Sequence, residues 1–130
     1  MALQQVVKGY GGAAKFTVAA SAARTAELTT DDFTVPYGQT LHLTIEVTSI
    51  TSTPILTPSI EGVTGPLGNV YTVLLGAAIS ATGITVLKIG PGIGQVANGA
   101  AADMLPDVWR VVVAVADTDS ATYSIEAEVR

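Results

Sequence analysis

The chain has 130 residues, of which 13% are charged and 48% are apolar, and its formal net charge at pH 7 is −5. Its length suits one domain with a substantial core, and its six basic residues are too scattered to form a surface for nucleic acid. No window of about 20 residues is free of polar or turn residues, so no membrane-spanning helix is expected. The lack of cysteine excludes disulfide frameworks, zinc ribbons and thiol chemistry.

The N-terminal residues lack the apolar run of a secretory signal peptide. Gln4, Gln5, Lys8 and Lys15 interrupt every apolar stretch, so we expect synthesis in the cytoplasm. The segment Gly9–Gly12 is rich in glycine, which permits many backbone conformations. The sequence therefore predicts a flexible N-terminal arm over residues 1–13, joined by a hinge to a single β domain over residues 14–130.

Candidate strands follow the arm. Lys15–Ala20 and Ala26–Thr34 are the weaker ones, and Leu41–Thr48 is much stronger because its apolar and polar residues alternate strictly. Ile55–Val63 is again weaker. Asn69–Leu75 and Ile84–Ile89 are rich in β-branched and large apolar residues, which are typical of strands.

The C-terminal part supplies two more strands. Trp109–Ala116 is an apolar run broken only by Arg110, as expected of a central strand covered on both faces, and Tyr123–Val129 alternates strictly. The best helical stretch, Gln95–Leu105, is short and is stopped by Pro106. Strands that recur about every 10 to 12 residues predict an all-β fold, either an antiparallel β-sandwich or a jelly-roll-like barrel of about eight strands.

The segment Gly90–Ala97, GPGIGQVA, contains the G-x-G-x-x-A pattern of dinucleotide-binding turns. Pro91 lacks the N–H group that a phosphate cradle needs, and Asn98-Gly99 breaks the helix that should follow. Only Gly90–Asp107 separates the flanking strands, which is too short for a parallel crossover. We therefore predict a long irregular connection between two antiparallel strands, and no nucleotide cofactor.

The acidic residues and the histidine do not form a recognisable catalytic or metal site. Asp31-Asp32 and Asp117–Asp119 lack further ligands at calcium-loop spacing, so turn and cap roles are expected. His42, the only histidine, has no catalytic companion in any familiar pattern. Glu126 and Glu128 share one strand face, where a solvated pair is a simpler interpretation than a glycosidase pair. Catalytic, cofactor-binding and metal-binding residues are all predicted to be absent.

Trp109 and Arg110 are bulky neighbours that face opposite ways if they lie on a strand. We expect Trp109 to fill the core between sheets, and Arg110 to pair with an acid near the start of its strand, where Asp103 and Asp107 lie. The alternative is that the pair anchors an interface, since Trp and Arg are favoured there.

The low charge predicts a covered surface. Typical soluble domains have about 25% charged residues, and a monomer with only 13% has few groups to keep its surface polar. We expect other copies or a partner to cover part of it, the alternative being a monomer with a bland Thr, Ser and Ala surface. The apolar residues of the arm and of the long connection are the candidate contacts, namely Val6, Val7, Tyr10, Pro91, Ile93, Val96, Met104 and Leu105.

Five stretches along the chain form a further pattern when taken in order: Ala20–Ala26, Thr44–Pro54, Ala81–Gly92, Asp103–Val111 and Ser120–Ser124. As a set, they resemble a group of small structural proteins of tailed bacteriophages. The resemblance implies a non-enzymatic virion component, with a capsid decoration (cement) protein favoured, made in the host cytoplasm and placed on the capsid surface. The expected partners are the major capsid protein and further copies of the chain, a trimer being favoured, rather than nucleic acid or membrane.

Two other functions are also compatible with the sequence. A tail or neck component would fit the same resemblance. A host-glycan-binding module would stack sugars on exposed aromatic side chains, but the chain offers only Trp109 and four tyrosines, and Trp109 is expected in the core.

Overall fold

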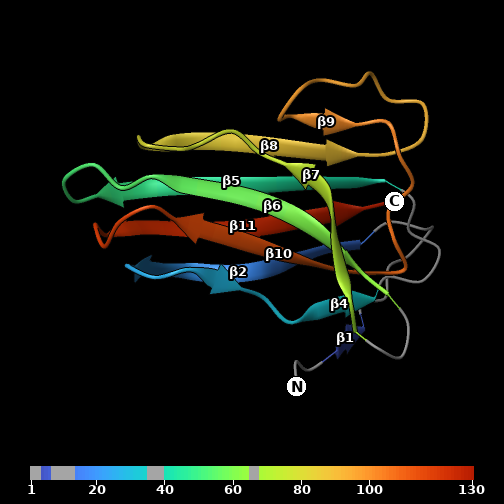
Figure 1. Ribbon diagram of the computed structural model, residues 1–130, viewed down its shortest axis with the longest axis horizontal. Coiled ribbons are helices and arrows are strands. Elements are labelled where there is room, and N and C mark those ends of the chain that lie inside the picture. Colours follow the sequence, from blue (N-terminus) through green and yellow to red (C-terminus); the bar gives the residue numbers. More distant parts are fainter. Residues whose placement is uncertain (1–3, 7–13, 35–39, 65–67) are drawn as a thin grey trace.

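The computed structural model is a two-layer β-sandwich (Figure 1). It describes residues 14–34, 40–64 and 68–130, together with the backbone of residues 4–6. One layer is a six-stranded sheet, with the order β1 (Gln4–Val6), β4 (Asp32–Thr34), β10 (Val108–Val115), β6 (Leu56–Val63) and β7 (Val70–Leu75), and with β3 (Leu28–Thr29) also paired to β10. The predicted all-β fold is confirmed, as a sandwich.

The second layer is a five-stranded sheet. Its order is β2 (Ala14–Arg24), β11 (Ala121–Val129), β5 (Leu41–Ile50), β8 (Gly83–Ile89) and β9 (Ala100–Ala101). The described strands outnumber the predicted eight because Ala26–Thr34 splits into β3 and β4, and because β1 and β9 are too short to show a period. Most neighbours are antiparallel, but β1 with β4 and β8 with β9 are parallel.

The predicted arm lies largely outside the described residues. Gln4–Val6 form β1 and pair with β4, while residues 1–3 and 7–13 are outside the described ranges. Gln95–Leu105 contains β9 and an antiparallel bridge between Val96 and Ala100 instead of a helix. Within the described ranges there is no helix of a length and hydropathy that would cross a membrane.

The core lies between the two sheets and is built from the alternating strands. Every second residue is buried from Leu41 to Val47 in β5 and throughout β11, because adjacent side chains of a strand point to opposite faces. Trp109 is fully buried, as predicted, and its ring centroid lies 5.0 Å from that of Phe33 and 6.1 Å from that of Phe16. Since Phe16 is in β2 and Phe33 is in β4, this aromatic cluster joins the two layers.

The Gly90–Asp107 connection passes from one sheet to the other. The strands that it joins, β8 and β10, are not neighbours in one sheet, because they belong to different layers. After the turn at Pro91-Gly92 the chain returns beside β8, where the Lys88 N–H donates to the Gly99 carbonyl at 3.0 Å. This return forms β9, and the chain then crosses to β10.

Candidate interaction surfaces

The outward-facing side of the five-stranded sheet is polar except on β8, where Ile84 and Val86 are exposed. The polar face is defined by its acidic and basic residues, which are Lys15, His42, Glu46, Lys88, Glu126 and Glu128. Strand register places Lys15, Glu128, His42 and Lys88 side by side in one row across four strands. This face therefore carries both acidic and basic residues, as on a surface that meets water.

The outward-facing side of the six-stranded sheet has a different composition. On its three neighbouring strands β10, β6 and β7 the outward residues define the apolar face: Thr57, Ser59, Glu61, Val63, Val70, Thr72, Leu75, Val108, Arg110, Val112 and Ala114. Val70 is 42% exposed and Leu75 is 51% exposed. The described residues form two layers only (Figure 1), so no described element covers this face.

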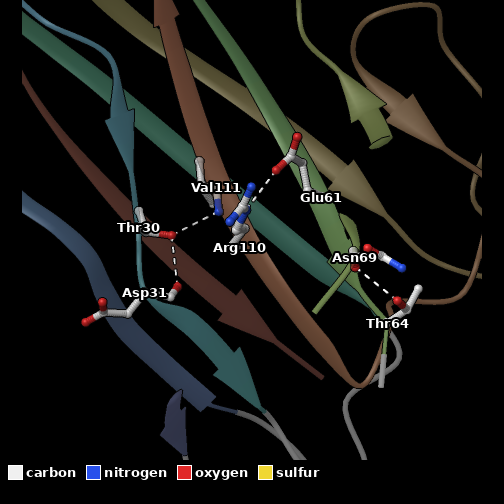
Figure 2. A network of polar contacts seen from close by, with 7 residues as sticks. All are labelled: Thr30, Asp31, Glu61, Thr64, Asn69, Arg110 and Val111. Atoms are coloured by element: carbon white, nitrogen blue, oxygen red, sulfur yellow. Dashed lines mark hydrogen bonds and ion pairs between the residues drawn. The ribbon is translucent and has the colours of Figure 1, made fainter. Parts of the chain in front are cut away.

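Arg110 and Glu61 are the only charged residues of the apolar face, and they neutralise each other. The Arg110 Nε atom lies 2.8 Å from Glu61 Oε1, and the side chains are 25% and 17% exposed (Figure 2). The expected pairing of Arg110 with Asp103 or Asp107 is wrong. Register is the reason, because Arg110 lies directly opposite Glu61 on β6, whereas Asp103 and Asp107 precede β10.

Thr30 lies between β3 and β4 and forms hydrogen bonds to Val111 of β10. Its N–H donates to the Val111 carbonyl at 3.0 Å, and its hydroxyl oxygen accepts the Val111 N–H at 3.0 Å. The same hydroxyl donates to the Asp31 carbonyl at 3.1 Å, as Figure 2 shows. The N–H and C=O groups of Val111 are thus both hydrogen-bonded at a point where no regular strand runs beside β10.

The long connection presents some of the predicted contact residues and buries one. Val96 and Met104 are each 59% exposed, Pro91 is exposed and Ile93 is half-buried. Leu105 is only 4% exposed and belongs to the core, so its side chain is not available to a partner. Of the candidates in the arm, Val7 and Tyr10 lie outside the described residues, and Val6 is described only through its backbone in β1.

The connection is tied to the edge of the apolar face. The side-chain amide of Asn98 donates to the Leu75 carbonyl of β7 at 3.0 Å. Asn98 has a positive φ of 59°, a conformation that Asn tolerates better than most residues. Exposed apolar residues of the connection, such as Val96, are therefore held close to exposed apolar residues of β7, such as Leu75.

His42, Glu126 and Glu128 lie on the polar face, as expected. His42 is exposed and lines a shallow hollow with Thr40, Glu128 and Arg130. The Arg130 guanidinium binds Glu128 Oε1 at 2.7 Å, and this hydrogen bond holds the pKa of Glu128 below its usual value. Glu126 accepts a hydrogen bond from the Thr17 hydroxyl at 3.1 Å.

The aspartates of the turn after β10 make local hydrogen bonds. Asp117 Oδ1 accepts the Asp119 N–H at 3.0 Å, and Asp119 Oδ2 accepts the Thr53 N–H at 3.1 Å. These contacts are those of a turn and of a bridge between two loops, which is the predicted role. Among the residues described, no three acidic or histidine side chains are grouped so as to hold a metal ion.

The apolar face is the feature that the sequence analysis missed. The apolar run on β10 is expected to be covered on both faces, but only alternate residues, Trp109, Val111, Val113 and Val115, point towards the core. Part of the evidence for this outward face is present in the sequence of β6, where outward Thr57 and Ser59 alternate with inward apolar residues. Without the β10–β6 register, nothing in the sequence shows that Val112 and Ser59 are neighbours on one surface.

Comparisons with known proteins give little further information. No family model matches the chain, and no curated protein matches it. Among solved structures, a chain in the structure of infectious bursal disease virus Gx strain is similar to 95% of this chain, with a TM-score of 0.40 and 12% sequence identity. This chain spans 28% of the length of that viral chain. A TM-score this low shows neither a shared family nor a shared function.

Proposed function

We propose that this protein is a non-enzymatic structural component of a tailed-phage virion, a capsid decoration (cement) protein that binds the outer shell and bridges neighbouring capsid subunits. The observation that carries the proposal is the unequal distribution of charge between the two outer faces of the sandwich. The sequence resemblance to small tailed-phage structural proteins supports the choice of virion.

The apolar face is the surface that we assign to the shell. Its one cation and one anion, Arg110 and Glu61, already neutralise each other at 2.8 Å, so a partner need not supply a countercharge. Covering the surrounding Val and Leu side chains removes apolar area from water, which is the main favourable term in most protein association. The polar face then points away from the particle, where Lys15, His42 and Glu128 remain hydrated.

Bridging neighbouring subunits requires a second contact area on the same molecule. The Gly90–Asp107 connection supplies one, because Val96 and Met104 are exposed and Asn98 fixes the connection against β7. In this proposal the apolar face binds one capsid subunit and the connection binds the next, or another copy of the chain. The partners are thus the major capsid protein and the protein itself, and the location is the virion surface.

The experiment that tests the proposal images particles of the phage that encodes the chain and then measures rebinding. We expect copies over the whole shell, and purified protein should bind particles that lack it. Val112→Lys places a charge in the apolar face and should weaken this binding at least about tenfold. Ser124→Lys makes the same charge change on the outward side of β11 and should bind like the wild type.

Three outcomes would contradict the proposal. The first is the absence of the protein from purified particles. The second is its confinement to a single vertex, which would favour the tail or neck. The third is binding that Ser124→Lys weakens as much as Val112→Lys does, because the two outer faces would then be equivalent. Circular dichroism of both variants shows that they are folded before binding is compared.

A further inference from the structure

β8 has a long edge that is paired over only part of its length. β5 pairs with β8 over Gly83–Ile89, whereas β9 pairs with it only at Lys88 and Ile89 (Figure 1). The Lys88 N–H points to β9, where it donates to Gly99. Backbone groups of alternate residues point to the same side of a strand, so those of Ile84 and Val86 also point away from β5. No strand in the described ranges pairs with them there.

The other sheet edges are protected against pairing, and this one is not. Proteins guard edges with charges, prolines, bulges or short strands. β2 has two register shifts against β11 and carries Lys15 and Arg24 near its ends. β7 has one register shift, and β1 is three residues long. By contrast, Gly83–Leu87 pairs with β5 without a shift and contains neither a charge nor a proline.

We propose that this edge of β8 pairs with the β8 edge of a second copy, antiparallel and two-fold symmetric about Thr85. In this register Ile84 lies opposite Val86 of the second copy. The outward N–H and C=O groups of Ile84 then hydrogen-bond to those of Val86 in the second copy. The two-fold axis generates the same pair a second time, between Val86 and Ile84 of the second copy. The two five-stranded sheets become one continuous sheet, and this inference is independent of the proposed function because it concerns the protein alone.

The side chains of the edge suit such a pair. Ile84 is 64% exposed and Val86 is 40% exposed, and both lie on the outward side of the sheet. Pairing brings these side chains into contact with their symmetry mates, which covers apolar surface that one copy leaves in water. Thr85 meets Thr85 of the second copy at the symmetry axis, and Thr–Thr is a favourable cross-strand pair.

The net charge of the protein does not oppose this contact. The nearest acid on the same face is Glu46, which lies opposite Ile84 on β5. In the paired sheet, three strand spacings separate the two copies of Glu46, or about 14 Å. That distance exceeds the Debye length of about 8 Å at physiological ionic strength, so their repulsion is largely screened.

The geometry also limits the assembly. β9 occupies the edge beyond Leu87 and stops the paired segment from sliding past it. When an edge pairs with the same edge of a second copy about a two-fold axis, neither copy has that edge free to bind a third. A cyclic trimer instead needs contacts between two different surfaces of the chain. The β8 edge therefore favours a dimer over the trimer expected from the sequence resemblance.

Sedimentation velocity of the purified full chain tests the assembly. We expect a dimer at micromolar concentration. Ile84→Lys changes an exposed side chain on the unpaired edge and should give a folded monomer. Ser124→Lys makes the same charge change on β11, within the same sheet, and should remain a dimer. A wild-type monomer, a trimer, or a dimer that Ile84→Lys leaves intact would overturn the proposal.

A disulfide tests the register. The chain has no cysteine, so Thr85→Cys introduces a single thiol. In the proposed pair the two Cα atoms at position 85 form a non-hydrogen-bonded pair about 4.5 Å apart, within the range that a disulfide spans. Mild oxidation should give a covalent dimer. Thr44→Cys on β5 would lie about 14 Å from its mate, and should stay uncrosslinked. Failure of Thr85→Cys to crosslink, or equal crosslinking of both variants, would overturn the register.

Discussion

The ring of Tyr71 lies on Gly62 of the neighbouring strand, so close that a Cβ atom at Gly62 would overlap Cζ of the ring. Gly62 also lies opposite Trp109 on its other side. Because directly paired residues share a face, the missing side chain leaves a space beside the indole that the tyrosine ring fills. The edge strand β7 is thus attached to the core through a tyrosine that is itself 48% exposed.

Gly62→Ala should lower the free energy of unfolding by about 1 kcal/mol, because the new methyl group forces the Tyr71 ring out towards solvent. In a Tyr71→Ala background the same change should have no cost, since Ala is otherwise better than Gly within a strand. Urea unfolding of the four proteins measures the coupling. Equal effects of Gly62→Ala in both backgrounds would show that Tyr71 does not depend on the glycine.

Thr30→Val should cost about 1–3 kcal/mol, because it leaves the buried Val111 N–H without an acceptor. Thr30→Ser keeps the hydroxyl and should recover most of the loss. Thr29→Val, on the exposed neighbouring residue opposite Val112, is the matched control and should change stability by less than about 0.5 kcal/mol. If Thr29→Val and Thr30→Val cost the same, the hydrogen bond to Val111 would not be the cause.

Arg110→Met and Glu61→Gln should each destabilise the protein by about 1–2 kcal/mol, because each leaves a half-buried charge without its partner. The double variant should cost less than the sum of the two. A thermodynamic cycle from denaturant unfolding gives the coupling, expected to be about 1 kcal/mol for a pair with this exposure. Arg130→Met, which removes a far more exposed ion pair with Glu128, should leave stability unchanged within error. Additive effects at Arg110 and Glu61 would contradict the prediction.

Alkaline pH should destabilise the fold through Tyr123. Burial raises the pKa of this phenol above 10.0, and the Arg24 guanidinium 4.5 Å from the ring centroid partly offsets the increase. The unfolded chain therefore loses the proton first, so stability is complete below about pH 10 and falls as the pH rises towards the folded-state pKa. Tyr123→Phe should flatten this fall while retaining the ring beneath Arg24. Unfolding at several pH values checks it, and an unchanged slope would show that another group is responsible.

Local patterns were sufficient for the strands that alternate strictly. Leu41–Thr48 and Tyr123–Val129 correspond to β5 and β11, because each strand has one buried face and the side-chain period is two residues. Trp109 could be assigned to the core because it is bulky and faces the opposite way from Arg110. The short strands β1 and β9 carry too few residues to show any period, so their existence depends on the neighbours that they meet in space.

The candidate surfaces could not be predicted, because they depend on strand order and register. Arg110 and Glu61 are 49 residues apart, and only the pairing of β10 with β6 brings them together. The strand containing Ile84 and Val86 was predicted, but its unpaired edge is a property of the sheet order and of how short β9 is. Asp103 and Asp107 are nearer to Arg110 in sequence, but strand pairing places Glu61 beside it.

The position of β11 also affects how the chain can fold during its synthesis. This strand is the last in chain order, yet it lies between β2 and β5 in the five-stranded sheet. Before residues 121–129 have left the ribosome, β2 has no partner strand among the described residues. The inward side chains of β5 then lack the adjacent side chains of β11. The five-stranded sheet therefore cannot be completed until residues 121–129 emerge, whereas β5 can already pair with β8, and β10 with β6. During that interval β2 and one edge of β5 lack their partner β11, and unpaired strand edges favour misassembly.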